Sequence, residues 1–139
     1  MTKLLLVDTS GWRRSGHDSV AASWAERLGA DELATCPQVR LEVLYSARNA
    51  ADYDAIVSEL DGLHQVSTGD EAFQRALSVQ QMLAHVGGLH HRSVKISDLL
   101  IAASAEVAGA SVWHYDEDFD RVAAVTRQRT QWIAARGSL

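Results

Sequence analysis

The chain has 139 residues and a formal net charge of −5, from 18 acidic and 13 basic side chains. Hydrophobic residues make up 47% of it and there is one proline, so it has enough apolar material for a core and disorder is not expected. This length predicts a single domain spanning residues 1–139. At face value the acidic balance argues against a nucleic-acid binder, because phosphate binding normally requires a basic patch.

Cysteine content and hydropathy exclude further classes. Cys36 is the one cysteine, so neither an internal disulfide nor a multi-thiolate metal site is possible, which fits a reducing, cytoplasmic setting. The longest apolar runs are residues 4–7 and 99–103, far below the roughly 20 residues that span a bilayer. We therefore expect no interaction with a membrane.

The first half of the chain alternates short apolar runs with helical patterns. Residues 4–7 indicate a buried strand, which ends in a turn that begins at Asp8. The following pattern predicts a helix at 18–28, a strand at 32–36, helices at 37–48 and 52–60, and a strand at 63–67.

The second half continues this alternation. Residues 70–86 form an amphipathic pattern with Phe73 and Leu77 on its apolar face, and residues 97–107 are apolar nearly all round, which predicts a buried helix. A strand at 110–115, a turn at 116–118, a helix at 119–125 and a last strand at 130–134 follow. This order predicts a three-layer α/β/α sandwich around a mainly parallel sheet.

Carboxylates interrupt or border the apolar segments at five positions: Asp8, Glu42, Asp98, Asp116 and Asp118. Ligands of such sheets bind beyond the carboxyl ends of the strands, where Asp8 and Asp116 are both expected. Isolated carboxylates in apolar settings are costly unless paired or bound to a metal, and convergent ones need a cation. Oxygen ligands without a His or Cys set favour Mg²⁺ or Mn²⁺.

Each acid also has a structural interpretation. Asp8 fits a turn or a helix N-cap, Asp98 complements a helix dipole, and Glu42 fits a solvated helix face. Asp116 and Asp118 fit a turn, with Asp118 as the cap of the last helix. Taken singly, both interpretations stay open; small residues at 102 and 105 leave room above Asp98 and favour function there.

Four short motifs that contain these acids follow one another along the chain: LVDTS at 6–10, RLEV at 40–43, SDLLIAA at 97–103 and HYDEDF at 114–119. In this order they resemble the motifs of the PIN-domain ribonucleases, and among them those of the VapC toxins of bacterial VapBC toxin–antitoxin pairs. The resemblance covers essentially the whole chain. It departs from the family pattern at Ser97, where proline is frequent, and at His114, where Thr or Ser is common.

The resemblance implies a metal-dependent endoribonuclease with a PIN-like fold. Asp8, Glu42, Asp98 and Asp116 would be catalytic and, with Asp118 as a helper, would hold one or two Mg²⁺ or Mn²⁺ ions that activate water. It also implies an RNA substrate, a homodimer, and a VapB-like antitoxin whose C-terminal segment occupies the site.

Five further residues are candidates for supporting roles: Ser10, Arg13, Arg92, Lys95 and His114. Ser10 is a hydrogen-bond partner for a carboxylate or bound water. Arg13 and its neighbour Arg14, in an expected loop, are candidates for contact with RNA. The basic run at 90–95 is a candidate for steering RNA phosphates, although a solvated loop fits the run equally well. His114 is either a hydrogen-bond donor to water or phosphate or simply a strand-end histidine.

Two other functions compete with this interpretation. A haloacid-type, Mg²⁺-dependent phosphatase requires Asp-x-Asp after the first strand, whereas Thr9 and Ser10 follow Asp8 here. A non-enzymatic, receiver-like acidic domain would bind only a metal or a partner.

Without the five proposed site acids, 13 acidic residues remain against 13 basic ones. The acidity is therefore expected to lie in one pocket that divalent ions neutralise.

Overall fold

The computed structural model describes residues 3–139 as five strands in one parallel sheet with helices on both faces. The strand order is β3-β2-β1-β4-β5, and all four neighbouring pairs are parallel. The strands are β1 (Leu5–Val7), β2 (Leu33–Thr35), β3 (His64–Gln65), β4 (Ser111–His114) and β5 (Thr130–Trp132). The expected α/β sandwich with a mainly parallel sheet is confirmed.

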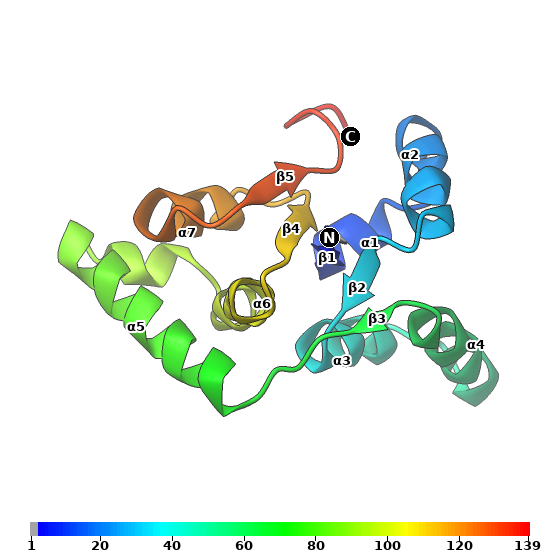
Figure 1. The fold of residues 1–139 in the computed structure, drawn as a ribbon, viewed down its shortest axis with the longest axis horizontal. Coiled ribbons are helices and arrows are strands. Elements are labelled where there is room, and N and C mark those ends of the chain that lie inside the picture. Colours follow the sequence, from blue (N-terminus) through cyan, green and yellow to red (C-terminus); the bar gives the residue numbers. More distant parts are fainter. Residues whose placement is uncertain (1–2) are drawn as a thin grey trace.

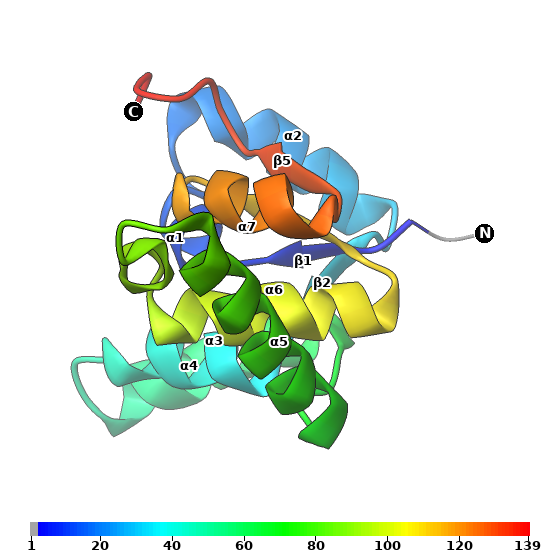
Figure 2. The same cartoon turned by 90° about the vertical axis from the view of Figure 1, so that its left-hand side faces the viewer.

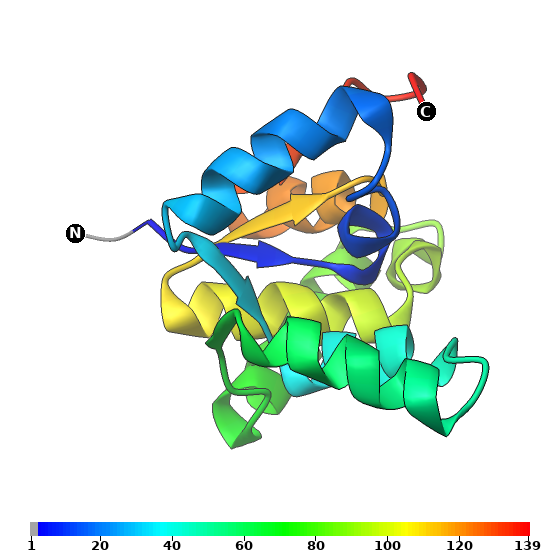
Figure 3. The same ribbon diagram turned by 90° about the vertical axis from the view of Figure 1, so that its right-hand side faces the viewer.

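Helices cover the sheet on its two sides, as Figure 1 shows. The α-helices are α1 (Thr9–Arg13), α2 (Asp18–Gly29), α3 (Pro37–Tyr45), α4 (Ala50–Asp61), α5 (Asp70–Val86), α6 (Ile96–Ala108) and α7 (Asp118–Thr126). Seen from one side, α5 and α7 lie nearest the viewer (Figure 2), and from the other side α2 and α4 do (Figure 3). Helix α3 packs against α1, α4 and α6.

The core forms where the sequence is most continuously apolar. All three residues of β1 are buried, and so is every residue of α6 from Asp98 to Ala105. Helix α6 lies between β4 and α5 and contacts both, which explains why its apolar residues surround the helix. Among residues 3–139, no helix has both the length and the apolar character that a bilayer crossing requires.

The structure differs from the expected elements in two places near the site. The segment after Asp8, expected as a turn, is helix α1, and Arg13 is the last residue of that helix rather than part of a loop. The helix is stable despite its length because Asp8 accepts a hydrogen bond from the Gly11 amide at 2.8 Å and caps it. Within the expected loop at 90–95, residues His90–Ser93 form the short 3₁₀ helix η1.

A third difference concerns the outer helix α5. Phe73 and Leu77, expected on its buried face, are 50% and 59% exposed. The buried residues of α5 are instead Ala72, Ala76, Val79 and Leu83, because α5 packs on α6 through a narrow stripe of mostly small side chains. Phe73 and Leu77 lie at the edge of that stripe and line a shallow groove with Ile96.

Candidate metal and catalytic site

The carboxyl ends of β1 and β4 bring two acidic residues to the same edge of the sheet. Val7 pairs with Trp113 in the parallel register, so Asp8 and Asp116 follow neighbouring strands. Helix α6 contributes Asp98 in its first turn, and α3 contributes Glu42. All four line one pocket of about 230 Å³. The four acids proposed as catalytic, which are far apart in sequence, therefore face a common space.

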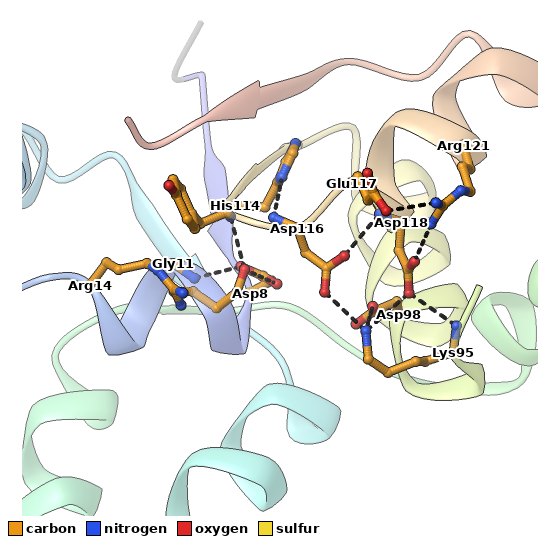
Figure 4. A network of polar contacts seen from close by, with 12 residues as sticks. Asp8, Gly11, Arg14, Lys95, Asp98, His114, Asp116, Glu117, Asp118 and Arg121 are labelled. Carbon is orange, nitrogen blue, oxygen red and sulfur yellow. Dashed lines mark hydrogen bonds and ion pairs between the residues drawn. The ribbon is translucent and has the colours of Figure 1, made fainter. Parts of the chain in front are cut away.

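Asp8 lines this pocket and is held by hydrogen bonds to α1 (Figure 4). Its Oδ1 accepts hydrogen bonds from the Gly11 amide and the Ser10 hydroxyl, each at 2.8 Å, and Ser10 lies 2.7 Å from Oδ2. The Ser10 hydroxyl oxygen in turn accepts from the Tyr115 amide at 2.8 Å, which ties α1 to the loop after β4. The one proton of the Ser10 hydroxyl is thus donated to the Asp8 carboxylate, both of whose oxygens lie within its reach.

Three carboxylates form a tight cluster beside Asp8. Asp98, Asp116 and Asp118 each offer one oxygen, and these oxygens lie within 4.8 Å of one another. The Lys95 ammonium reaches all three, with Nζ at 3.3 Å from Asp98, 3.0 Å from Asp116 and 3.1 Å from Asp118. A cation thus sits among the three carboxylates.

Burial makes this cluster electrostatically expensive without a metal. Desolvation raises the pKa of Asp8 to about 6. Desolvation, together with a hydrogen bond to Asp118, raises the pKa of Asp98 to about 8. Although burial opposes it, the hydrogen bonds from Asp98 and Lys95 lower the pKa of Asp118. Partial desolvation by itself would lower the pKa of Lys95. The hydrogen bond to Asp116 and the neighbouring carboxylates outweigh it, so the pKa is raised.

Asp118 lies in the cluster and does not cap the last helix. Glu117 is the N-cap residue of α7, and the Asp118 amide donates to Asp116 Oδ1 at 2.9 Å. One Asp118 oxygen accepts from the Lys95 amide at 3.1 Å, and the other accepts from Arg121 at 2.9 Å. The expectation that Asp118 acts as a cap is wrong because the turn ends one residue earlier than the sequence pattern suggested.

Glu42 lies on a different wall of the pocket from the cluster. It projects from α3, is half-buried, and its Oε2 accepts a hydrogen bond from Gln38 at 3.1 Å. It also borders a second, shallower hollow, together with Arg13, Leu41 and Tyr45. The Gln38 contact leaves Glu42 with unused acceptor capacity toward the pocket.

Two arginines line the same pocket as the carboxylates. Arg13 and Arg14 both line the pocket, and the Arg14 guanidinium lies 4.4 Å from the centroid of the Tyr115 ring. Within residues 3–139, the Arg13 side chain has neither a hydrogen bond nor an ion pair. Arg92, which the sequence analysis grouped with Lys95, is exposed on η1 and does not line the pocket.

His114 is fully buried behind the site. Its ring packs between Phe119 and Trp132, with centroids 5.0 and 4.9 Å away, and its Nδ1 accepts from the Asp116 amide at 3.2 Å. Burial lowers the pKa of His114 to about 4, so the ring is neutral at neutral pH. This position gives it no route to an RNA phosphate; it supports the backbone of Asp116 instead.

Sequence reasoning missed Tyr115, Gly11 and Arg121, all of which hold parts of the site. Arg121 was detectable, because it follows Asp118 at a spacing of three within a helix. The contribution of Gly11 was not, since it depends on how closely α1 approaches β4.

The donor set fits a hard divalent cation. Every candidate ligand in the cluster is a carboxylate oxygen, which suits Mg²⁺ and Mn²⁺. Asp8 and Asp98 are both buried with raised pKa values, and a nearby positive charge would stabilise their ionised forms. The Lys95 ammonium shows that the cluster accommodates a cation.

Comparison with known proteins gives the family. The PIN domain family matches residues 5–125. Ribonuclease VapC18 of Mycobacterium tuberculosis is 58% identical over 133 residues, covering 96% of this chain and 97% of that protein. Ribonuclease VapC21 of the same species is 40% identical over 139 residues, covering 99% of each.

Solved structures agree on the fold. The DNA-bound VapBC of Salmonella typhimurium contains a chain that superposes with a TM-score of 0.77 at 16% identity, covering 96% of this chain and all of that one. VapBC-5 of Mycobacterium tuberculosis gives a TM-score of 0.64 at 24% identity, covering 95% of this chain and 98% of that one. Together with the sequence relatives, these findings show that the chain belongs to the PIN domain family and, within it, to the VapC proteins.

Proposed function

We propose that this protein is a Mg²⁺- or Mn²⁺-dependent endoribonuclease, the toxin of a type II toxin–antitoxin pair. The observation that carries the proposal is the convergence of Asp8, Glu42, Asp98 and Asp116 on one pocket. The relatives VapC18 and VapC21, named as ribonucleases, support RNA as the substrate.

The chain's own residues divide the work of this site. Asp8, Asp98 and Asp116, with Asp118 and Glu42, would hold the metal. A divalent ion bound there lowers the pKa of water and stabilises charge on a reacting phosphate. Ser10 helps to orient Asp8, because its hydroxyl donates its one proton to that carboxylate. Arg13 and Arg14 stand at the rim, where a guanidinium can orient an incoming phosphate.

The proposal includes partners and setting. The structural neighbours titled as VapBC complexes support a VapB-like antitoxin, whose C-terminal segment we expect to occupy the acidic pocket. An arginine in that segment would pair with the carboxylates as a charge-assisted contact. A homodimer, a cytoplasmic location and a single domain over residues 1–139 remain predictions.

RNA cleavage by purified variants tests the proposal. With Mg²⁺ present, Asp8→Asn and Asp98→Asn should each lower the cleavage rate by about 100-fold or more, because each removes a charge at the metal. Glu26→Gln, which removes an exposed acid on α2 away from the pocket, is the matched control and should cleave normally. Undiminished cleavage by both site variants, or by the wild type in EDTA, would refute the proposal.

The same preparations separate the rival functions. Hydrolysis of a small phosphate monoester without RNA cleavage would indicate the phosphatase. Thermal stabilisation by the metal with no hydrolysis of either substrate would indicate a binding domain. The phosphatase lacks support in the geometry, since the hydroxyl of Ser10 stands where that chemistry needs a second carboxylate and donates to Asp8.

A further inference from the structure

Lys95 has an unusual position for a surface lysine. Its ammonium nitrogen lies within 3.3 Å of one oxygen of each carboxylate in the cluster, Asp98, Asp116 and Asp118. These are the same three residues whose oxygens are spaced to hold a metal ion. The ammonium and a divalent ion would therefore use the same ligands.

The Lys95 backbone is fixed while its side chain is free to leave. The Lys95 amide donates to Asp118 at 3.1 Å, and its carbonyl accepts from the Asp98 and Leu99 amides at the start of α6, each at 3.1 Å. The side chain, by contrast, is 63% exposed. Its flexible stem can move the ammonium into solvent with no change in the fold around the cluster.

From this geometry we propose that Lys95 is a built-in counter-ion that competes with the divalent metal for the acidic cluster. In the absence of metal, its single charge offsets part of the repulsion among three carboxylates. When a metal binds, the ammonium is displaced, since two cations cannot share the same oxygens at contact distance. The inference rests on the metal-binding part of the proposed function.

Competition has two opposite consequences for a variant that lacks the ammonium. Lys95→Met should bind the metal more tightly, because no internal cation has to be displaced. The same variant should be less stable without metal, because the three carboxylates lose the charge that offsets their repulsion. A lysine that instead helped to position the ligands would give weaker metal binding on removal.

Mn²⁺ binding to the full chain, without RNA, tests this inference. The free-ion signal of Mn²⁺ in electron paramagnetic resonance gives the Kd, and thermal melting in EDTA gives the metal-free Tm. We expect Lys95→Met to bind Mn²⁺ about 5-fold or more tightly than the wild type, with a lower Tm in EDTA. Lys95→Arg keeps the charge and should stay close to the wild type.

Arg92→Met is the matched charge control. It removes a positive charge three residues away, on an exposed side chain that does not line the pocket. Lys95→Gln is a second variant for use if Lys95→Met does not fold. Unchanged or weaker Mn²⁺ binding by the Lys95 variants, equal tightening by Arg92→Met, or no Mn²⁺ binding by the wild type would each overturn the inference.

The test separates this inference from the proposed ribonuclease. Selective tightening of Mn²⁺ binding in a protein that cleaves no RNA supports the role of Lys95 and refutes the enzyme. Metal-dependent RNA cleavage with unchanged Mn²⁺ affinity in the Lys95 variants supports the enzyme and refutes the role of Lys95.

Discussion

Gly11 lies so close to β4 that an alanine there should destabilise the fold and disturb Asp8. A Cβ at this position would be 2.8 Å from the backbone oxygen of Trp113, 3.1 Å from Val7 Cγ1 and 3.3 Å from Asp8 Oδ1. The nearest of these atoms is a backbone carbonyl within the sheet, which cannot rotate away as a flexible side chain can. Either α1 shifts outward or β4 moves.

The magnitude follows from two opposing effects. Overpacking of this kind costs about 1–3 kcal/mol. Replacing glycine by alanine within a helix returns up to about 1 kcal/mol of intrinsic propensity. With an overpacking cost in the middle of that range, about 2 kcal/mol, and the full return of about 1 kcal/mol, the free energy of unfolding of Gly11→Ala should fall by about 1 kcal/mol. At about 4 °C per kcal/mol for a chain of this length, the Tm should fall by roughly 4 °C.

Gly29→Ala is the matched control for this substitution. Gly29 ends α2, and a Cβ there has no heavy atom within 4 Å, so the variant should gain about 0.5–1 kcal/mol. Urea denaturation of both variants measures the difference, which we expect to be about 2 kcal/mol. Since the Gly11 amide donates to Asp8, Gly11→Ala should also bind Mn²⁺ more weakly. Equal stability of the two variants would refute the close packing of α1 on β4.

Three further predictions concern the site. Ser10→Ala should lower the free energy of unfolding by about 1–3 kcal/mol in urea titrations, because it leaves the Tyr115 amide without its acceptor; no change would contradict that role. Mn²⁺ at about 100 times its Kd should stabilise the wild type by about 2.7 kcal/mol, and melting curves of Asp98→Asn should show much less. Burial lowers the pKa of His114 to about 4 in the folded protein, whereas an unfolded histidine titrates near 6.5. As the pH falls through this range, the unfolded chain binds a proton at residue 114 before the folded chain does, which destabilises the fold. Between about pH 6.5 and 4 in EDTA, the wild type should lose about 3 kcal/mol more stability than His114→Gln, and parallel unfolding curves would refute this.

The fold was largely predictable because hydrophobic periodicity determines most of its elements. The buried strand β1 and the apolar helix α6 both occur where continuous apolar runs predicted them. The N-cap interpretation of Asp8 is confirmed, but the extent of α1 was not predictable, since five residues beginning Thr-Ser-Gly carry no periodic pattern. It depends on tertiary contacts, namely the Asp8 cap and the close approach of Gly11 to Trp113.

The site was predictable to different degrees for different residues. The proximity of Asp8 and Asp116 follows from the parallel topology alone. By contrast, the position of Glu42 and Asp98 in the same site was expected only from the family resemblance. The contacts of Lys95 with Asp116 and Asp118 could not be derived, because these residues lie 21 and 23 positions further along the chain, in the loop after β4 and at the start of α7. The burial of His114 depends likewise on β5, whose Trp132 covers the ring.

The net charge of the chain is a poor guide to its substrate, because the charges are distributed unevenly. The buried acids lie together at the carboxyl edge of the sheet, and two cations, Lys95 and Arg121, already pair with that cluster. Arg13 and Arg14 stand above it at the rim of the pocket. A phosphate that enters this pocket meets guanidinium groups as well as carboxylates, and a divalent ion at the carboxylates would reverse the local charge there. An acidic chain can thus present a locally favourable surface to a polyanion, and its affinity for RNA should depend on the metal.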